Sequence, residues 1–403
     1  MNIKYDVAIV GGGIVGLLTS LALAKSECKI IHIEKEGLQV KNDNRSIAIS
    51  YSSIAFLNTL GLWDKVKNKA YAIKNVHVSD KGKYGRAIIC AKDENLPFLG
   101  AIVPMQDLLA VALHSVDNNP NIFKSFSTNV VDLSRNEDQY SLIVKYKDEI
   151  KNIKASLIIA CDGANSGIRS ILNVSANTTD YQQDALVFDI ATDLDNHNTA
   201  FERFMTDGIL AMLPKSKTTM GCVWTINRED SKAKIELDYK SFESLLQDRF
   251  GYRLGQIKLI SKPAVFPLYL VQSDQIYKSN VLFFGNALHF LHPVSGQGMN
   301  LSIRDIGVLY DLIVECDFSC NSVKNILEEF AKIRKADHDR TIFITHGFVK
   351  WFVSDDIKLI ISRNLGLHLL QRSKLAKRKL SRLMMGKLSK GSTLMRKVVE
   401  NDS

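Results

Sequence analysis

The 403-residue sequence predicts an α/β protein with a Rossmann-like domain, an inserted and mostly antiparallel β-sheet, and a helical C-terminus. Three observations lead to this fold class. Three glycines separate a β-branched strand at residues 5–10 from an apolar segment with helical spacing at 14–24. Polar segments punctuated by short strands follow at 75–103 and 185–270. Beyond residue 303, glycine and proline become scarce and helical periodicity dominates.

The first domain is predicted to be discontinuous along the chain. A strand at residues 29–34 completes a βαβ unit, and a helix is expected around 52–60. Buried-strand runs at 157–160 and 281–284 return the chain to the same sheet. The predicted first domain comprises residues 1–74, 104–180 and 276–330, the second comprises 75–103 and 181–275, and a helical region with a basic tail covers 331–403.

The composition is that of an ordinary globular protein, with 46% hydrophobic and 24% charged residues. The six cysteines are scattered, and only Cys316 and Cys320 lie close together in the sequence. One CxxxC pair without a second cluster does not make a zinc site, so we expect no metal. Buried thiols in a reducing compartment are the simpler interpretation.

The formal net charge of +9 belongs to the C-terminal segment alone. Residues 346–403 hold 13 Lys or Arg and 4 Asp or Glu, whereas residues 1–345 hold 39 of each sign. The charge is therefore a local feature of a tail, and no nucleic-acid partner is expected.

Residues 7–24 form an uncharged run that also resembles an export signal. Three consecutive glycines inside it would each cost about 1 kcal/mol in a helix, and Asp6 stands where a signal peptide carries positive charge. We therefore expect no signal peptide. The sequence also contains no other apolar segment long enough to suggest a bilayer span.

The glycine turn reads GGGIVG over residues 11–16, which fits the GxGxxG pattern between a strand and a helix. The first glycine allows the tight turn, the second admits a pyrophosphate, and the third packs the helix on the sheet. Glu34 ends the next strand, where a carboxylate accepts from a ribose hydroxyl. The turn predicts a dinucleotide site, which FAD and NAD both fit.

Two later motifs follow strand-like runs and distinguish between these cofactors. They are CDGANSGIR at residues 161–169 and GNALHFLHPVSGQGMN at 285–300. With the glycine turn, they make the sequence resemble the FAD-dependent aromatic hydroxylases of the para-hydroxybenzoate hydroxylase type. That family carries GxGxxG, DGxxSxxR and GDxxHxxxPxxGQGxN in this order. The resemblance implies non-covalent FAD, a first domain that binds it, and a second domain that binds the substrate.

One branch of the family is most similar. Asn286 replaces the usual Asp, and Leu-His-Pro precedes Gly-Gln-Gly, as in the bacterial ubiquinone-biosynthesis hydroxylases and especially the 2-octaprenyl-6-methoxyphenol hydroxylases. Further matches are AFERF at 200–204, Trp224, and SRNLG at 362–366. Ile209 departs from the branch, where a proline is expected.

The resemblance carries a set of cofactor residues onto this chain. A helix that begins at residues 296–300 would point its N–H groups at the flavin pyrimidine edge, Asn286 would meet the ribityl chain, and Arg45 would lie near the phosphates. The implied set is Gly11, Gly13, Gly16, Glu34, Arg45, Gln106, Asp162, Gly163, Arg169, Gly285, Asn286, Pro293, Gly296, Gln297, Gly298 and Asn300.

The catalytic acid or base is not identified by these motifs. His289 and His292 are the candidates, although histidines in such a turn more often hydrogen-bond to the backbone. By resemblance the flavin carries the chemistry: NAD(P)H or another donor reduces it, O2 adds at C4a, and the hydroperoxide oxygen passes to a phenol.

The expected function is therefore hydroxylation of a prenylated phenol with O2, in the cytoplasm or at the inner face of the cytoplasmic membrane. A hydroxylase of a small soluble aromatic compound is one alternative. A non-catalytic, FAD-stabilised subunit of a ubiquinone-biosynthesis complex is the other, and such a complex is also a candidate partner of the enzyme itself.

The basic tail has two open interpretations. Over residues 372–390, helical spacing gathers the apolar side chains on one face and leaves the basic ones mostly elsewhere. The segment is either a solvated cationic face packed on the first domain or an interfacial helix on anionic lipid. The apolar stripe comprises Ala376, Leu380, Leu383, Met384 and Leu388, and the basic residues are Lys374, Lys377, Arg378, Lys379 and Arg382.

Overall fold

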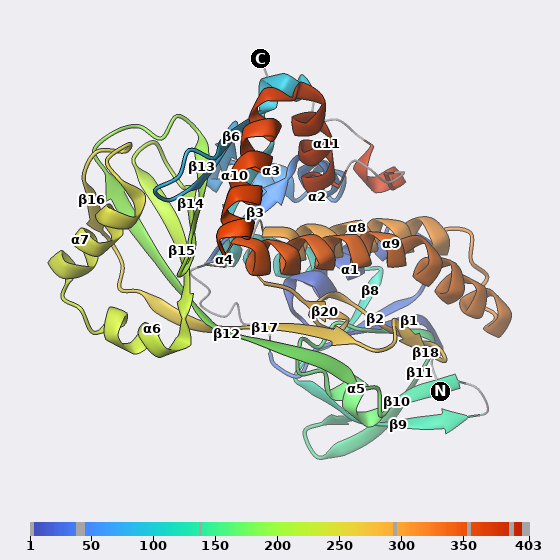
Figure 1. Cartoon of the computed structure of the whole chain (residues 1–403). Helices are drawn as coiled ribbons and strands as arrows, with labels where there is room; N and C mark the ends of the chain where they lie inside the picture. Colours follow the sequence, from blue (N-terminus) through green and yellow to red (C-terminus); the bar gives the residue numbers. More distant parts are fainter. Residues whose placement is uncertain are drawn as a thin grey trace.

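A computed structural model describes residues 4–37, 45–136, 139–292, 296–352, 356–386 and 391–396, with only the backbone described for 348–352. Its first sheet has the strand order β18-β19-β11-β1-β2-β8, and its central pairs are parallel (Figure 1). An antiparallel hairpin of β9 and β10 extends from β11. The strands are β1 (Lys4–Val10), β2 (Ile30–Ile33), β8 (Ile122–Ser125), β9 (Thr128–Asn136), β10 (Gln139–Tyr146), β11 (Glu149–Ala160), β18 (Tyr277–Lys278) and β19 (Val281–Phe283).

Strand β1 shows why this sheet is buried on both faces. Val7 and Ile9 point into one hydrophobic cluster, whereas Ala8 and Val10 point into a second cluster on the opposite face. Helices cover the first of these faces, so a continuous apolar strand is stable here. They are α1 (Ile14–Leu23), α4 (Met105–Asp117) and α8 (Gln297–Ile313).

The second sheet has the order β20-β17-β12-β15-β14-β13-β5-β6, with β16 (Ile257–Leu259) beside β12. It is antiparallel except for the parallel pair of β13 and β5. Helices α6 (Arg228–Ile235) and α7 (Tyr239–Phe250) cover its outer face (Figure 1). The strands are β5 (Asn75–Asp80), β6 (Arg86–Cys90), β12 (Ala176–Thr192), β13 (Thr199–Met205), β14 (Gly208–Pro214), β15 (Thr219–Asn227), β17 (Ala264–Ser273) and β20 (His289–Phe290).

A third, three-stranded sheet was not predicted. Strand β7 (Gly100–Pro104), which the sequence assigned to the second sheet, pairs instead with β3 (Ser46–Ser50) and β4 (Tyr71–Ile73). Alternation identifies a strand but not its partner, which explains the error. The proposed domain boundaries remain a prediction. Short helices connect the strands of the three sheets. They are α2 (Tyr51–Thr59), α3 (Trp63–Val66), η1 (Lys67–Lys69), η2 (Ala91–Glu94), α5 (Gly167–Ile171) and η3 (Gly285–Ala287).

The C-terminal region is helical, as expected. Helix α9 (Cys320–Phe352) runs along α8, and α10 (Ile357–Arg372) packs beside α11 (Lys374–Met384) (Figure 1). The turn η5 (Thr393–Met395) contacts α2 and α8. None of the helices within the described ranges combines the length and apolarity that a bilayer span requires.

The cysteines only partly match the expected buried thiols. Cys28 and Cys222 are buried, and burial raises the pKa of both thiols. Cys320 is exposed at the start of α9, so the prediction is wrong at that position. The first turn of a helix leaves some positions facing solvent, and a small thiol is tolerated there.

Candidate functional site

One large cavity, of ≈ 1550 Å³, lies between the first sheet, the inner face of the second sheet, and helices α10 and α11. Drug-sized ligands occupy pockets of about 300–1,000 Å³. The cavity therefore has room for a dinucleotide and a second molecule together. Twelve of the predicted site residues line it: Gly11, Gly13, Glu34, Arg45, Asp162, Gly163, Asn286, His292, Gly296, Gln297, Gly298 and Asn300.

The glycine turn between β1 and α1 forms one wall. Gly11 has a φ of +116°, and a side chain there would collide with the backbone of Cys161. A Cβ on Gly16 would collide with the Gly11 carbonyl, so this glycine, which does not line the cavity, lets α1 pack closely. Gly13 is different, because a Cβ there would meet nothing within 4 Å. Its open side is the space that a pyrophosphate needs.

Glu34 follows β2 and lies against this turn. Its carboxylate accepts hydrogen bonds from the Gly12 N–H and, at 2.9 Å, from the Glu36 N–H. Two backbone donors therefore fix the carboxylate at the edge of the cavity. A carboxylate accepts about four hydrogen bonds in all, so capacity remains for a ribose hydroxyl.

The DGxxSxxR motif forms the next part of the wall. Asp162 Oδ2 accepts from the Ile168 N–H at 3.1 Å, whereas its Oδ1 is buried without a hydrogen-bond partner within the described residues. An orphaned acceptor on a cavity wall fits a ligand hydroxyl. Gly163, with a φ of +94°, also leaves open space.

Arg169 does not line the cavity. Its guanidinium is buried and donates to the carbonyls of Ala287 at 2.8 Å and Ala164 at 2.7 Å. Arg169 therefore connects the motif at residues 161–169 to the motif at residues 285–300. Gly285 is likewise buried, against Val15, at a φ of +57°. These two predicted residues support the wall from behind it.

Helix α8 starts at the cavity. Its N-cap, Gly296, has a φ of +57° and offers no side chain to cap the first N–H groups. Asn300 bonds inside the protein instead: it donates to the Ala48 carbonyl at 2.9 Å and accepts from the Ser50 N–H at 2.9 Å. The helix terminus is thus held against β3 at the cavity wall, where a partial positive charge develops.

The remaining predicted residues are less uniform. Asn286 and Arg45 line the cavity, and the Arg45 guanidinium lies 5.8 Å from the centre of the Phe266 ring. Gln106 is exposed on α4 and does not line it. Pro293 lies outside the described residues.

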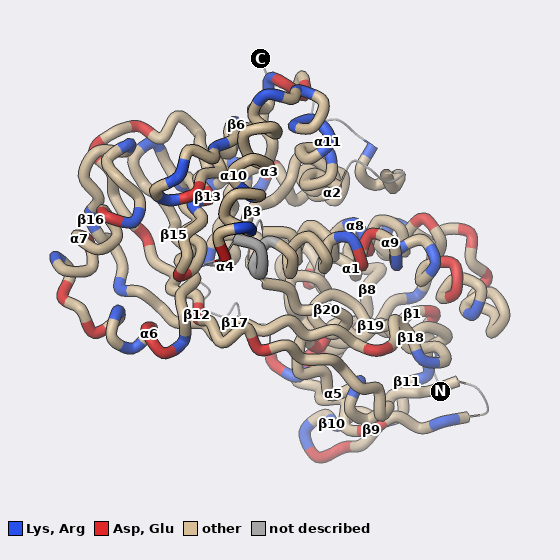
Figure 2. The backbone as a smooth tube through the Cα atoms, in the orientation of Figure 1, with Lys and Arg blue, Asp and Glu red and all other residues tan. Residues whose placement is uncertain are grey.

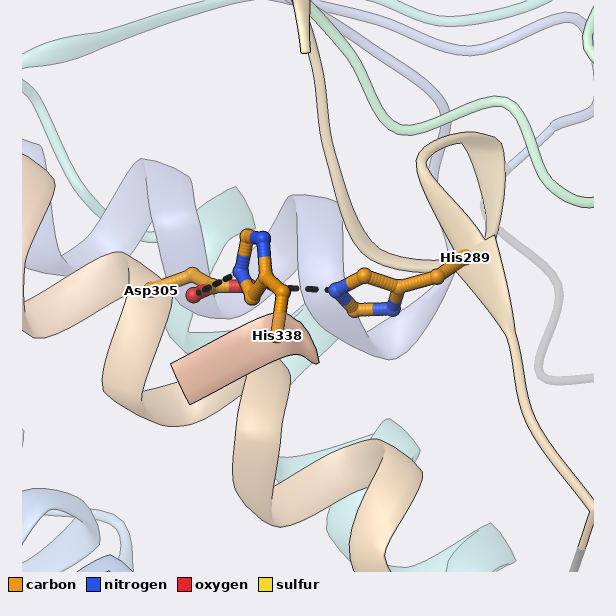
Figure 3. A group of neighbouring side chains, drawn as sticks. All are labelled: His289, Asp305 and His338. Atoms are coloured by element: carbon orange, nitrogen blue, oxygen red, sulfur yellow. Dashed lines mark hydrogen bonds and ion pairs between the residues drawn. The ribbon is translucent and has the colours of Figure 1, made fainter. Parts of the chain in front are cut away.

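His289 belongs to a buried cluster with Asp305 and His338, none of which lines the cavity (Figure 3). Asp305, on α8, accepts from His338 Nε2 at 2.8 Å, and His289 Nε2 lies 3.7 Å from its other oxygen. His338 and Arg334 hold the pKa of the Asp305 carboxyl well below its usual value, although burial opposes the shift. Burial lowers the pKa of His338.

These three residues have the geometry of a metal site, which the sequence did not suggest. Arg334 argues against a cation, because its guanidinium lies 2.5 Å from Asp305 and 2.6 Å from Asp337. Arg304 also bonds Asp337, so two arginines already balance two carboxylates. A divalent ion would leave buried positive charge uncompensated. We interpret the cluster as an ion-pair network that joins α8 to α9.

His292 does line the cavity. Burial lowers its pKa to about 3, and its ring packs edge-on to Tyr181 at 5.1 Å between centroids. The imidazole is therefore neutral near pH 7, with one ring N–H donor and one acceptor nitrogen.

The inner face of the second sheet forms a floor that sequence reasoning did not identify. Strand alternation turns Ala200, Glu202 and Phe204 of β13 towards the cavity, while Phe201 packs among the outer-face residues. Among the described lining residues of this sheet, Glu202 is the one ionisable group. The floor comprises Val76, Val78, Ile89, Ala185, Val187, Ala200, Glu202, Phe204, Ala211, Leu213, Val223, Phe266, Pro267 and Leu268.

Helices α10 and α11 close the cavity. Arg363 forms a buried ion pair with Asp80 of β5 at 2.8 Å, and the Asn364 side chain donates to the same carboxylate at 3.0 Å. Asn364 Oδ1 and Gln371 Oε1 accept from backbone N–H groups of Gly85 and Ile88, both at 2.8 Å. We call these four contacts the α10 clamp.

The apolar stripe of α11 faces inward, against the interfacial interpretation of this helix. Ala376, Leu380 and Met384 line the cavity. Leu383 is half-buried and Leu388 lies outside the described residues. Among the basic residues, Lys377 lies 3.9 Å from Asp93, and Arg382 lies 3.3 Å from Glu94. The helix is thus packed on the protein, while Lys374 and Lys379 remain exposed.

Curated relatives match nearly the whole chain. It is 27% identical over 392 residues to the "Ubiquinone hydroxylase UbiL" of Rhodospirillum rubrum, covering 96% of this chain and 90% of that protein. It is 26% identical over 401 residues to the "3-demethoxyubiquinol 3-hydroxylase" of Escherichia coli, covering 96% and 99%. These matches confirm the resemblance to the ubiquinone-biosynthesis hydroxylases.

A solved structure with the same fold is PqsL of Pseudomonas aeruginosa, titled a probable FAD-dependent monooxygenase. It superimposes with a TM-score of 0.77 at 18% identity and covers 91% of this chain and all of that one. This likeness confirms the predicted fold class. A model described as "Squalene epoxidase" matches residues 256–400. Residues 4–318 match the model described as "FAD binding domain", so the FAD prediction is confirmed and the chain belongs to that family.

Proposed function

We propose that this protein is an FAD-dependent monooxygenase that hydroxylates the aromatic ring of a prenylated phenol in ubiquinone biosynthesis. In this reaction one oxygen atom of O2 enters the ring and the other leaves as water. NAD(P)H or another two-electron donor supplies the electrons. The full-length similarity to proteins named ubiquinone hydroxylases supports this function.

The open glycines and the orphaned Asp162 oxygen fit FAD at one end of the cavity. In our assignment the pyrophosphate lies over Gly13, with Arg45 near the phosphates and Glu34 at the adenosine ribose. Asp162 and Asn286 bind hydroxyl groups along the cofactor. When bound and reduced, FAD would supply the two electrons that activate O2 for transfer of one of its oxygen atoms to the ring.

The start of α8 would lie at the flavin ring in this assignment. The partial positive charge at this helix terminus would stabilise negative charge that develops on the pyrimidine edge. Asn300 would position this terminus by bonding α8 to β3. The aliphatic floor excludes water from the reacting atoms.

The chemistry of the floor is the observation that favours a prenylated phenol. The described lining residues of the second sheet include no Lys or Arg. Among the described residues, the cations that line the cavity are Lys35, Arg363, which is paired with Asp80, and Arg45, whose guanidinium lies 5.8 Å from the centre of the Phe266 ring at the edge of the floor. An aromatic acid bound on this sheet would bury its carboxylate without a cationic partner from the sheet itself, which is costly. A neutral phenol with an apolar tail has no such penalty.

Glu202 supplies the polar group that a phenol needs. Glu202 lies on the floor between Val78 and Ala211, the residues that pair with it on the two neighbouring strands. A carboxylate accepts a hydrogen bond from a phenol hydroxyl and repels an acid. We propose that Glu202 orients the ring.

The domain organisation, the cellular location and the partners are also part of the proposal. We propose that the division of the chain into an FAD-binding domain, a substrate-binding sheet domain and a C-terminal helical region holds as predicted from the sequence. We also propose a cytoplasmic enzyme that acts at the inner face of the cytoplasmic membrane and joins other enzymes of ubiquinone biosynthesis.

Turnover assays test the function directly. Holoprotein is given a reductant, O2 and either a prenylated phenol or para-hydroxybenzoate, and the products are identified by mass spectrometry. We expect an added oxygen atom in the prenylated phenol alone. Preferential hydroxylation of the acid would favour the soluble-substrate alternative. The absence of product from both, with FAD bound and reducible, would favour a non-catalytic subunit.

A further inference from the structure

Helix α10 carries an apolar stripe on its outer face. Ile357, Ile361, Leu365 and Leu369 are exposed by 69%, 61%, 56% and 57%, and their spacing of four places them along one side of the helix. Leu375, at the start of α11, is 80% exposed. We call these five residues the α10 stripe. Contiguous apolar surface of this kind marks an interaction site in soluble proteins.

The exposure of the stripe does not result from loose packing of α10. The α10 clamp fixes the opposite side of the helix through Arg363, Asn364 and Gln371. Leu367, between Leu365 and Leu369, is buried on the inner side. The helix is thus held in a single orientation, with its apolar stripe outward.

The electrostatic surroundings suit an anionic partner. Residues 357–399 include 12 Lys or Arg and no Asp or Glu. Basic residues concentrate on α11, beside α10 (Figure 2). Lys358, Arg372, Lys374 and Lys379 are exposed. An apolar stripe bordered by exposed cations is the pattern of a surface that lies on anionic lipid.

The cavity opens beside the stripe. Leu369 and Ala376 both line the cavity and are exposed to solvent, so they lie at its mouth between α10 and α11. Gly366, Leu370 and Ser373, which lie close to Leu369 and Ala376 in the sequence, also line the cavity. An apolar chain that leaves the cavity here would emerge next to the stripe.

A tyrosine lies beside the same helix. Tyr84 is fully exposed in the turn between β5 and β6, and the next residue, Gly85, donates its N–H to Asn364. Tyrosine is favoured at the boundary between lipid and water, because its ring is apolar and its hydroxyl is polar.

We propose that the α10 stripe docks into an anionic membrane surface, and that the mouth between α10 and α11 admits the prenyl chain directly from the bilayer. The proposal rests on the proposed function for the identity of the chain, but the docking itself does not. It assigns membrane contact to α10, whereas the sequence had pointed to α11. A second copy of this chain or another protein would compete for the same stripe.

Vesicle co-sedimentation of the holoprotein tests the docking. The variant Ile361→Gln/Leu365→Gln is compared with Ile150→Gln/Leu194→Gln, which alters residues that are 69% and 53% exposed outside α10 and α11. On vesicles that contain phosphatidylglycerol, we expect the stripe variant to lose affinity by roughly tenfold or more. The control variant should bind like the wild type. Bound FAD verifies that each variant is folded.

Two results would overturn the docking. One is equal vesicle binding by the stripe variant and the wild type. The other is no vesicle binding by the wild type, together with a dimer in analytical ultracentrifugation that the stripe variant abolishes, since a second copy would then cover the stripe.

The mouth is tested with Ala376→Trp, which adds bulk at the opening. Turnover of a long-chain prenylated phenol in vesicles should fall severalfold more than turnover of a phenol with one prenyl unit that is added in solution. Equal rates on the long chain would overturn the role of the mouth. If the wild type hydroxylates neither phenol while it still binds vesicles, the proposed function fails and the docking stands.

Discussion

The two ends of the cavity are built in different ways. At the cofactor end, the wall is mostly backbone, and glycines such as Gly13 and Gly163 leave the space open. At the substrate end, the floor takes one to three side chains from each of several strands, and the roof comes from α10 and α11. Backbone cradles require particular residues at fixed spacing, whereas a packed floor requires only suitable volume and polarity. We expect substitutions to act differently at the two ends.

The largest expected effect is at the cofactor end. Gly13 has φ −67° and ψ 167°, which valine adopts readily, so Gly13→Val should fold but fill the space needed by the pyrophosphate. We expect no retained FAD after gel filtration, measured by visible absorbance. Gly347→Val is the matched control, since Gly347 also has open space but lies on α9. Stoichiometric FAD in the Gly13 variant would refute the assignment of the pyrophosphate to the space over Gly13.

The next effect is at the roof. Asp80 and Arg363 have side chains only 2% and 1% exposed, so Asp80→Asn removes the negative charge of a buried ion pair. We expect the free energy of unfolding to fall by about 3–5 kcal/mol, measured by urea denaturation. Lys81→Gln is the neighbouring control. It breaks the more exposed pair with Asp248 and should cost less than about 1 kcal/mol. Similar losses of stability in both variants would contradict the stabilising role of the α10 clamp.

The smallest effect concerns pH. Burial lowers the pKa of His32, on β2 near the cofactor end, to about 4. Because this value is below that of the unfolded chain, the unfolded state takes up the proton first, and stability is lost as pH falls below about 6.5. From about pH 7 to about pH 5.5 the loss is about 1 kcal/mol. His32→Leu should flatten the pH dependence of urea unfolding by that amount.

The exposed His368 is the matched control for this measurement. His368→Leu should follow the wild-type pH dependence. His292 provides the comparison between the two ends, because burial lowers its pKa to about 3. His292→Leu should flatten the curve as much as His32→Leu does. An unchanged slope in the His32 variant would contradict its assignment as a neutral, buried imidazole.

Sequence reasoning worked where local backbone geometry was decisive. The β1–α1–β2 unit and the start of α8 at residues 296–300 lie where the motifs predicted them. It failed where the partner is distant. Strand β7 joined another sheet, and the apolar stripe of α11 turned towards the cavity. Periodicity defines a face of an element but not what covers it.

The site shows the same limit at the level of single residues. Arg169 and Asn300 belong to motifs, yet in the structure their polar groups bond the protein itself. Glu202 and Arg363 lie in segments quoted for the resemblance, but nothing local marked the first as a cavity residue or the second as the partner of Asp80. Those roles come from strand alternation and from a contact across the chain.

Asp80 and Arg363 are separated by 283 positions in the sequence. Contacts of such long range form slowly, because closing a long loop costs conformational entropy before the contact can stabilise the fold. The glycine turn and Glu34, by contrast, need only about twenty neighbouring residues to come together. We expect the roof to dock after the sheets have formed, so the cofactor enters through an open top and is enclosed by the last helices to settle.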